Sequence, residues 1–421
     1  MNKDLFIKKK QATLFRKYFL VASINIVVLI TLLEVTLRLI PSKYTEYPAR
    51  INYNSDKELG YFPEPLQDES YIINCVANSH IKTNEIGMRI TPSFPNSPIK
   101  IALLGDSFLH GLTVSDSLHM ATKLSLLSKT KVMNGGVCGY GTYQELLLWR
   151  KYMKPQKPKI TILFFFMDND IRDNQCDLER GEGEFYSPCC IVDSNKVKEV
   201  NDFEIRKNDS KTFSGWFKKN SFTYRALRNL WKSDRIKLTG EEFFNQTSFA
   251  YNVYRPGNNK IWNDGWKITE WSLASLKKEC DEVGSKLLIV KVPGPIQWTY
   301  NWKKEIAKQI KDDYLPLDFN IDYPDNRFES IINQTGIDLL DLNPSFIQYR
   351  DQFQLQEPLF GWCCDAHWNP LGHELAANSV NNHLLKLGWI SGQIIENTKS
   401  PKEILGEKMF EDIYTCQQIK F

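Results

Sequence analysis

The residue best placed to do chemistry is a serine that directly follows an apolar run. Residues 101–104 (Ile-Ala-Leu-Leu) precede Gly105-Asp106-Ser107-Phe108. We expect the run to form a buried strand and Ser107 to lie in the turn before a helix. In open α/β sheets, ligands bind at the carboxyl ends of strands, where helix N-termini present backbone N–H groups to anions. The position suits a nucleophile, although Asp106 and Ser107 could also be a simple helix cap.

A base and a carboxylate lie together near the other end of the chain. The segment Asp365-Ala366-His367 places an imidazole two positions from an acidic side chain. Acyl transfer needs a nucleophile, a base that takes its proton and a group that orients the base. We therefore predict that Ser107 is the nucleophile, His367 the base and Asp365 the orienting carboxylate. His110, which is close to Ser107 in sequence, is the alternative base.

Four motifs in chain order resemble those of the SGNH/GDSL hydrolase superfamily, whose blocks carry Ser, Gly, Asn and His. The first block matches Gly105-Asp106-Ser107-Phe108, and the others resemble residues 134–141, 166–170 and 365–367. The resemblance covers about residues 84–387. Phe108 stands where the family motif has leucine. One residue rather than two separates Asp365 from His367, as in a subgroup with N-terminal anchors.

The resemblance implies an oxyanion hole and an activity. Its donors would be the backbone N–H groups of Ser107 and Gly139 and the side-chain amide of Asn169, placed where the substrate carbonyl oxygen becomes negative. The structural alternatives are a loose glycine loop around Gly139 and an Asx turn at Asn169. The implied function is a serine esterase that acts on O-acyl esters through an acyl-serine intermediate. An O-acyltransferase acting on glycan hydroxyls and a non-catalytic envelope or glycan-binding protein are the alternatives.

The first fifty residues indicate a membrane anchor. Residues 18–40 are almost entirely apolar and long enough to cross a bilayer as a helix. The basic residues that precede them keep the N-terminus in the cytoplasm: Lys3, Lys8, Lys9, Lys10, Arg16 and Lys17. A cleaved signal peptide is the alternative, but no A-x-A-like site follows closely. We predict a single-pass inner-membrane protein with a periplasmic catalytic domain, and we expect Glu34 near the outer interface.

Charge and cysteine content limit the other function classes. The net charge is +3 and no long basic block follows the N-terminal segment, so nucleic-acid binding has no electrostatic support. Four of the nine cysteines form the adjacent pairs Cys189-Cys190 and Cys363-Cys364. Neighbouring cysteines rarely bridge each other, so we expect a disulfide between the two pairs rather than a zinc site. We predict no metal or cofactor, because Asp365 and His367 have no third ligand nearby.

The remaining patterns predict the domain organisation. Strand candidates at residues 100–104, 131–134, 160–166, 286–292 and 337–342 alternate with helical stretches at 117–128, 143–152, 267–283 and 372–387. Such continuous apolar strands predict a three-layer α/β/α sandwich around a parallel five-stranded sheet, of SGNH or flavodoxin-like type.

Around this sheet we expect five regions. They are a cytoplasmic tail (1–17), a transmembrane anchor (18–40), a linker and N-terminal extension (41–98), an SGNH hydrolase-like domain (99–390) and a C-terminal tail (391–421). Residues 41–66 look irregular, short strands are predicted at 71–76 and 81–89, and residues 174–262 look like an insertion with a helix near 222–231. The partners expected are the bilayer, an ester or glycan substrate and the machinery of an envelope or secreted polysaccharide.

Overall fold

The computed structural model describes residues 3–39, 51–71, 79–92, 94, 98–176, 178, 187–200, 221–224, 226–227, 240–246, 250–256, 260–299, 301–307, 314–355, 360–362 and 365–419. The chain divides into two compact units. One comprises Met1–Tyr47 with Asp209–Ile236, and the other comprises Pro48–Asn208 with Lys237–Phe421.

The second unit is built on a parallel sheet. Its strands are β5 (Ile99–Gly105), β6 (Lys131–Gly136), β7 (Ile160–Phe166), β10 (Lys286–Val292) and β11 (Asp338–Asp341). They pair in the order β11-β10-β7-β5-β6, and every pairing is parallel. The predicted five-stranded parallel sheet is confirmed, strand by strand.

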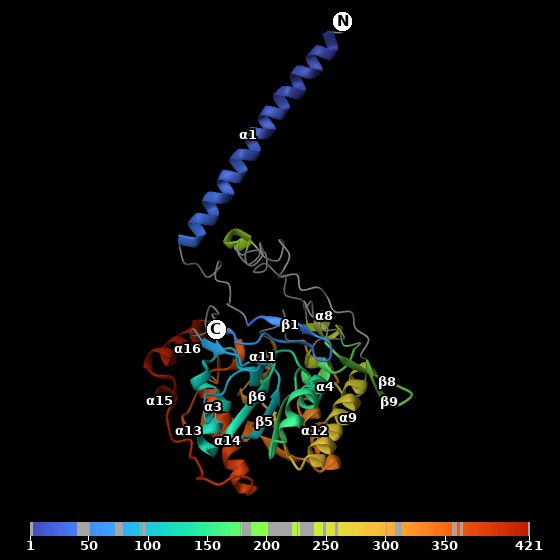
Figure 1. Ribbon diagram of the computed structural model, residues 1–421, viewed down its shortest axis with the longest axis vertical. Coiled ribbons are helices and arrows are strands. Elements are labelled where there is room, and N and C mark those ends of the chain that lie inside the picture. The colour runs from blue at the N-terminus through green and yellow to red at the C-terminus, as the bar shows by residue number, and fades with distance from the viewer. Residues whose placement is uncertain are drawn as a thin grey trace. The chain divides into compact units, whose positions relative to one another are not determined.

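Helices cover both faces of this sheet, which gives the predicted three layers. Ile101 and Leu103 of β5 pack in one core with α3 (Met120–Ser128), α13 (Asn343–Gln352) and α14 (Pro370–Lys386). Ala102 and Leu104 pack in the other core with α4 (Thr142–Leu148), α9 (Lys260–Glu282) and α12 (Tyr323–Thr335). Figure 1 shows these two groups of helices on either side of β5 and β6. Alternate side chains of a strand point to opposite faces, which is why an uninterrupted apolar run is buried here on both.

The strand order reverses at β5. After β5 the chain moves to β6 on one side and then crosses to β7 on the other. In open α/β sheets, the crevice for ligands opens at the carboxyl ends of the strands at this switch point. Ser107 follows β5 directly, so the topology places it at that crevice.

The N-terminal extension contains more regular structure than its sequence suggests. β1 (Tyr53–Asp56) and β2 (Gly60–Pro63) form an antiparallel pair where we expected irregular chain. A second pair joins β3 (Asp68–Tyr71) to β4 (Ser79–Lys82). Of the predicted strand at 71–76, only Tyr71 is described, as the last residue of β3, and residues 72–78 lie outside the described part of the chain. Strands this short depend on tertiary packing more than on pattern.

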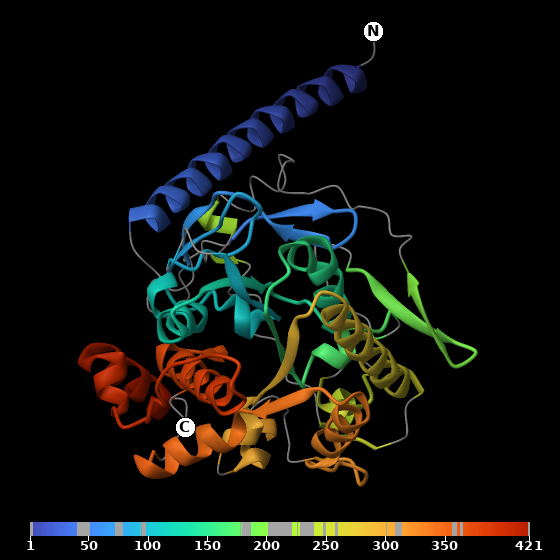
Figure 2. The ribbon, with the colours of Figure 1, turned by 60° about the horizontal axis from the view of Figure 1, so that its bottom comes forward.

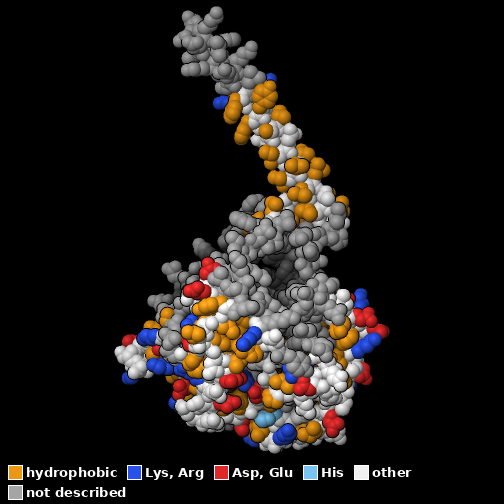
Figure 3. Space-filling model, turned by 180° about the vertical axis from the view of Figure 1, so that it is seen from behind, with side chains coloured by type: hydrophobic (Ala, Val, Ile, Leu, Met, Phe, Trp, Pro, Cys, Tyr) orange, Lys and Arg blue, Asp and Glu red, His pale blue; other side chains and the backbone are white. Residues whose placement is uncertain are grey.

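The first unit contains one long helix, α1 (Lys3–Leu39). Within it, Phe15–Leu39 has a mean hydropathy of 2.3 and is long and apolar enough to cross a membrane. Figure 3 shows hydrophobic side chains, in orange, over the part of this helix that is not grey. Glu34 does not stand alone on this helix: its carboxylate accepts hydrogen bonds from the N–H groups of Phe222 and Thr223, at 3.0 and 2.8 Å. The predicted helix near 222–231 is helical at 222–224 and 226–227, and its other residues lie outside the described part.

The disulfide prediction is wrong for one of its cysteines. Cys189 is bonded to Cys176, so it is not available to the other predicted pair. Cys189 begins β8 (Cys189–Asp193), which pairs with β9 (Lys196–Val200). Figure 2 shows this pair projecting at one side of the domain. The other two members, Cys363 and Cys364, lie outside the described residues.

Candidate active site

Ser107 is the first residue of a short helix at the end of β5. The helix α2 (Ser107–His110) is capped by Asp106, whose side chain accepts the N–H of Phe108 at 2.9 Å. An aspartate at this position supplies an acceptor for the otherwise unpaired N–H groups of the first turn. Gly105 is required just before it, since a Cβ atom there would lie 2.9 Å from the Cβ of Leu109. The local sequence therefore forces the sharp turn that presents Ser107.

The structure brings His367 to Ser107 from the far end of the chain. His367 lies in β13 (Asp365–Trp368), which pairs with β12 (Gly361–Trp362). Its Nε2 lies 2.7 Å from the Ser107 hydroxyl oxygen, across a sequence separation of 260 residues. The other ring nitrogen, Nδ1, is hydrogen-bonded to the Asp365 carboxylate, which also accepts the His367 backbone N–H at 2.9 Å. Serine, imidazole and carboxylate thus form one continuous chain of hydrogen bonds.

Packing fixes the orientation of the imidazole. The ring of Phe108 lies against that of His367, with centroids 5.0 Å apart. The hydroxyl of Thr113 donates to the carbonyl of Trp368 at 2.9 Å, which ties the end of β13 to the loop after α2. A base held in this way keeps one rotamer and one tautomer, which proton transfer from the serine requires.

The charges of the pair favour an imidazolium ion. Burial lowers the pKa of His367, but the hydrogen bond and charge of Asp365 outweigh burial and raise that pKa above its ordinary value of 6.5. Burial raises the pKa of Asp365, and the interactions with His367 outweigh it and lower that pKa below 3.8. The carboxylate is therefore ionised at neutral pH and stabilises the cation that forms when His367 accepts a proton.

Asn169 also lies at this site. It follows β7 and occupies the N-cap position of α5 (Asp170–Asp173) without a side-chain capping hydrogen bond, and its Nδ2 donates to Asp106 at 3.3 Å. The hydroxyl of Ser107 lies 3.4 Å from the same carboxylate oxygen. One Asp106 oxygen thus joins the predicted nucleophile and the predicted amide donor. The second proton of the amide nitrogen is then available to a substrate oxygen.

Gly139 lies in the loop that follows β6, next to α2. The loop is anchored there by the Val137 N–H, which donates to the carbonyl of Gly105 at 3.0 Å, and by the Cys138 N–H, which donates to Nδ1 of His110 at 3.2 Å. Gly139 itself has φ of +78°, a left-handed conformation that favours glycine. The structure therefore places all five predicted site residues at the carboxyl edge of β5, β6 and β7, together with β13.

Asp106 has a larger part in this site than we predicted. Its side chain is fully buried and contacts Ser107, Phe108 and Asn169. Burial raises the pKa of Asp106 above its ordinary value, against the opposing effect of the Phe108 N–H. The sequence indicated only a helix cap; the contact with Asn169 depends on the pairing of β5 with β7, which no local signal reveals.

His110 is not placed to act as the base. It is fully buried, and its Nδ1 accepts the Cys138 N–H and also lies 3.3 Å from the Tyr53 hydroxyl. Burial and the charge of Arg89 lower its pKa to about 3. The interaction with the Ser107 hydroxyl is made by His367 instead.

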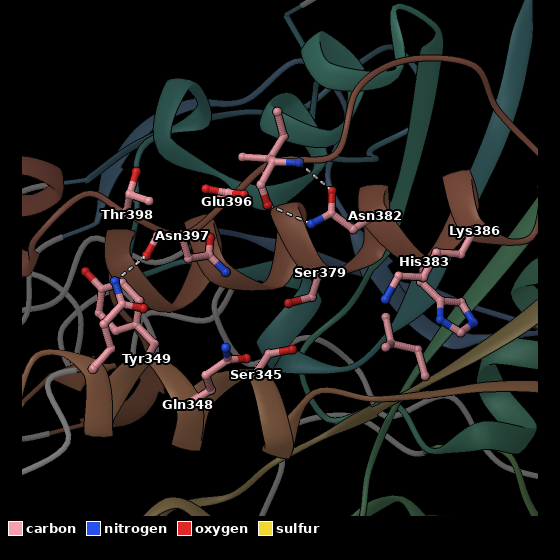
Figure 4. A pocket seen from close by; sticks show the side chains of 13 residues that line it. Ser345, Gln348, Tyr349, Ser379, Asn382, His383, Lys386, Glu396, Asn397 and Thr398 are labelled. Carbon is pink, nitrogen blue, oxygen red and sulfur yellow. Dashed lines mark hydrogen bonds between the residues drawn. The ribbon is translucent and has the colours of Figure 1, made fainter.

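A polar groove of about 450 Å³ lies away from these residues. It is bordered by α13, α14 and residues 395–398 (Figure 4). Asn382 holds the covering segment by two hydrogen bonds to the backbone of Ile395, at 2.7 and 2.8 Å. No predicted site residue lines the groove. We therefore interpret the groove as the place where residues 395–398 are attached to α14, and assign it no part in the chemistry.

Comparisons with known proteins give a limited result. No family model and no curated protein matches the chain. Among solved structures, it is similar to Axe2, an acetylxylan esterase from Geobacillus stearothermophilus, with 12% identity over 72% of this chain and 100% of that chain, at a TM-score of 0.34. It is similar to the acetyl xylan esterase AlAXEase with 13% identity over 67% of this chain and 98% of that chain, at a TM-score of 0.35. Likenesses of this size carry no argument about activity.

Proposed function

We propose that this chain is a serine esterase of the SGNH type, which cleaves O-acyl esters through an acyl-serine intermediate. The observation that carries the proposal is the chain of contacts from Ser107 through His367 to Asp365, with Nε2 and Oγ 2.7 Å apart. A hydrogen-bonded nucleophile and base, with the base oriented by a third group, is the arrangement that acyl transfer requires.

The proposed reaction has two halves. The Ser107 oxygen attacks the ester carbonyl carbon while His367 accepts the proton of the Ser107 hydroxyl. The carbonyl oxygen becomes an oxyanion, which accepts hydrogen bonds from the N–H groups of Ser107, Gly139 and Asn169. The carbon–oxygen bond to the alcohol then breaks, and His367 returns the proton to the leaving oxygen. In the second half, a water molecule attacks the acyl carbon and gives a proton to His367. The bond between that carbon and the Ser107 oxygen then breaks, and His367 returns the proton to the Ser107 oxygen, which releases the acid and free Ser107.

The location and substrate class belong to the same proposal. The apolar part of α1, preceded by basic residues, is proposed to cross the inner membrane with its N-terminus in the cytoplasm. The catalytic unit would then act outside the cytoplasm on acylated envelope or secreted polysaccharide. If a sugar hydroxyl reaches the acyl-serine before water does, the same site performs acyl transfer.

A serine-directed probe tests the nucleophile and its base together. Full-length protein treated with a fluorophosphonate is expected to carry the label on the peptide that contains Ser107. The label should be lost in Ser107→Ala, fall strongly in His367→Ala and persist in His80→Ala, which changes an exposed histidine paired with Asp68. Absence of label on Ser107 in the wild type would contradict the proposal. Turnover of a chromogenic acetyl ester, with and without an oligosaccharide acceptor, then separates hydrolysis from transfer.

A further inference from the structure

The loop that carries Gly139 is covered by the N-terminal pair of strands. The hydroxyl of Tyr61, in β2, donates to the carbonyl oxygen of Cys138 at 2.7 Å. The hydroxyl of Tyr140 donates in turn to the carbonyl of Tyr61, and the two rings meet edge to face with centroids 5.3 Å apart. A Cβ atom at Gly139 would lie 2.8 Å from the Tyr61 hydroxyl. The hairpin β1–β2 therefore contacts the loop at the peptide unit that the proposed mechanism uses.

The other polar group of the Cys138 backbone is held by His110. The N–H of Cys138 donates to Nδ1 of His110 at 3.2 Å, and the hydroxyl of Tyr53 lies 3.3 Å from the same nitrogen. Because the pKa of His110 is lowered to about 3 by burial and by Arg89, the imidazole is neutral near pH 7. Its Nδ1 can therefore act as an acceptor. Cys138 is thus fixed through both its N–H and its carbonyl.

Fixing the carbonyl of Cys138 also fixes the direction of the next N–H. The peptide bond between Cys138 and Gly139 is trans, so this carbonyl and the N–H of Gly139 point in opposite directions within one planar unit. Since Tyr61 holds the carbonyl on the side of the hairpin, the N–H of Gly139 faces away from the hairpin. Gly139 is exposed, and in the part of the chain that the structure describes its N–H donates to no protein group. It is open to a substrate oxygen.

We propose that Tyr61 and His110 are positioning residues, which hold the Cys138–Gly139 peptide with its N–H directed at the carbonyl oxygen of the bound ester. The inference rests on the proposed acyl-serine function and extends it to the hairpin. The hairpin β1–β2 then helps to position a catalytic group rather than serving only as a linker.

The expected effect follows from what the donor does. Oxyanion donors act because they are aligned before charge develops, and loss of a whole donor costs about 10²–10³ in rate. Loss of one of two supports leaves the donor present but less well aligned. We therefore expect a decrease of about tenfold, which falls on kcat because the interaction strengthens in the transition state.

Tyr61→Phe tests the proposal by removing the hydroxyl and keeping the ring. Full-length protein is assayed with a chromogenic acetyl ester, and labelling of Ser107 by a fluorophosphonate is timed. We expect kcat to fall about tenfold with KM within about twofold, and labelling to slow by a similar factor. The matched control is Tyr152→Phe, since Tyr152 stacks on Phe62 of the same hairpin at 5.3 Å. Its kcat is expected within about twofold of wild type.

Three outcomes would overturn the inference. These are a wild-type kcat in Tyr61→Phe, an increased KM at unchanged kcat, or equal losses in Tyr61→Phe and Tyr152→Phe, which would indicate general loosening of the hairpin. A wild-type protein that is inert to both ester and probe would count against the proposed function itself, and the inference would fall with it.

A second pair of variants tests the other support without a substitution in the hairpin itself. The Oδ1 atom of asparagine can accept the Cys138 N–H in place of Nδ1, whereas leucine cannot. His110→Leu is therefore expected to lose about tenfold in kcat, and His110→Asn to recover most of that loss. Equal kcat values in these two variants, measured on protein of equal melting temperature, would contradict the proposal.

Discussion

His367 lies beside a carboxylate, whereas His110, His119 and His373 are buried near the guanidinium group of Arg89. Asp365 raises the pKa of His367 against the effect of burial. Burial first, and then Arg89, lower the pKa of each of the other three. One histidine can therefore take up a proton near neutral pH, and the other three stay neutral.

The neutral histidines have structural roles that need an acceptor nitrogen. Nδ1 of His119 accepts the N–H of Ala121 at 3.1 Å and so caps α3, and Nδ1 of His373 lies 3.4 Å from the N–H of Met120. Nε2 of His119 lies 2.8 Å from the carbonyl of Leu109 in α2. Protonation of these rings would remove the acceptors. Burial lowers the pKa of all four rings, and the charge beside each ring opposes this effect at His367 and adds to it at the other three.

Arg89 acts both on the chain that follows α2 and on the three buried histidines. Its guanidinium group donates to the carbonyls of His110, Gly111 and Val114 at 2.5–2.7 Å and pairs with Asp116 at 2.8 Å. It therefore fixes the chain that follows α2, immediately behind Ser107. The same positive charge that orders this loop disfavours protonation of the surrounding imidazoles.

The largest expected effect is a difference in catalytic activity between a variant of His367 and a variant of the buried His373. His367→Ala removes the proposed base, and kcat/KM for an acetyl ester is expected to fall by about 10⁴-fold or more. His373→Asn leaves the proposed catalytic groups in place, so kcat per folded molecule is expected to stay within about threefold of wild type. Steady-state kinetics at matched folded fraction, determined by circular dichroism, make the comparison. A similar loss of activity in both variants would contradict the distinction between His367 and the buried histidines.

The next effect sharpens the role of the carboxylate. Asp365→Asn is expected to lower kcat by about 10²–10⁴-fold, because the imidazolium loses its counter-ion and the tautomer is no longer fixed. The general base must be neutral, so wild-type activity is expected to decline as the pH falls through a value above 6.5. Without Asp365 the pKa of His367 falls, and this acid limb should move to lower pH. The pH profile of kcat/KM measures it; a limb that stays in place would show that Asp365 does not set the pKa of His367.

The fold and the positions of the reactive residues were accessible from sequence for different reasons. The sheet could be predicted because strands such as Ile160–Phe166 are buried on both faces and therefore read as continuous apolar runs. Ser107 and His367 were proposed from motifs, and the structure brings them together. The support of Gly139 by Tyr61 could not be predicted, because that contact joins residues 77 positions apart through a pair of four-residue strands.

Tertiary geometry also explains what the sequence analysis predicted wrongly or missed. Cys189 pairs with Cys176, only 13 positions away, whereas adjacency of cysteines suggested a distant partner. The role of Arg89 is equally invisible in sequence, since three of its four hydrogen bonds go to backbone carbonyls that any residues could supply, and the fourth goes to Asp116, 27 positions away. In both cases tertiary geometry, not residue type, selects the partner.

The smallest expected effect concerns the stability of the buried histidines. In the unfolded chain a histidine titrates near 6.5, whereas the folded-state pKa of His373 lies well below that value. Between these two values the unfolded state binds the extra proton. The stability that the buried ring confers is therefore complete above pH 6.5 and is lost progressively as the pH falls toward the folded-state pKa.

His373→Asn keeps an acceptor for the Met120 N–H and removes the titrating ring. Whatever its stability at pH 7.5, its free energy of unfolding should depend less steeply on pH between about 6 and 5, by up to about 1.4 kcal/mol per pH unit, the contribution of one proton. Urea denaturation at several pH values measures the slope. Wild-type protein measured in the same buffers is the reference for this slope. An unchanged slope in His373→Asn would mean that the ring takes up its proton at the same pH in the folded and the unfolded chain, which would contradict the distinction between the buried histidines and His367.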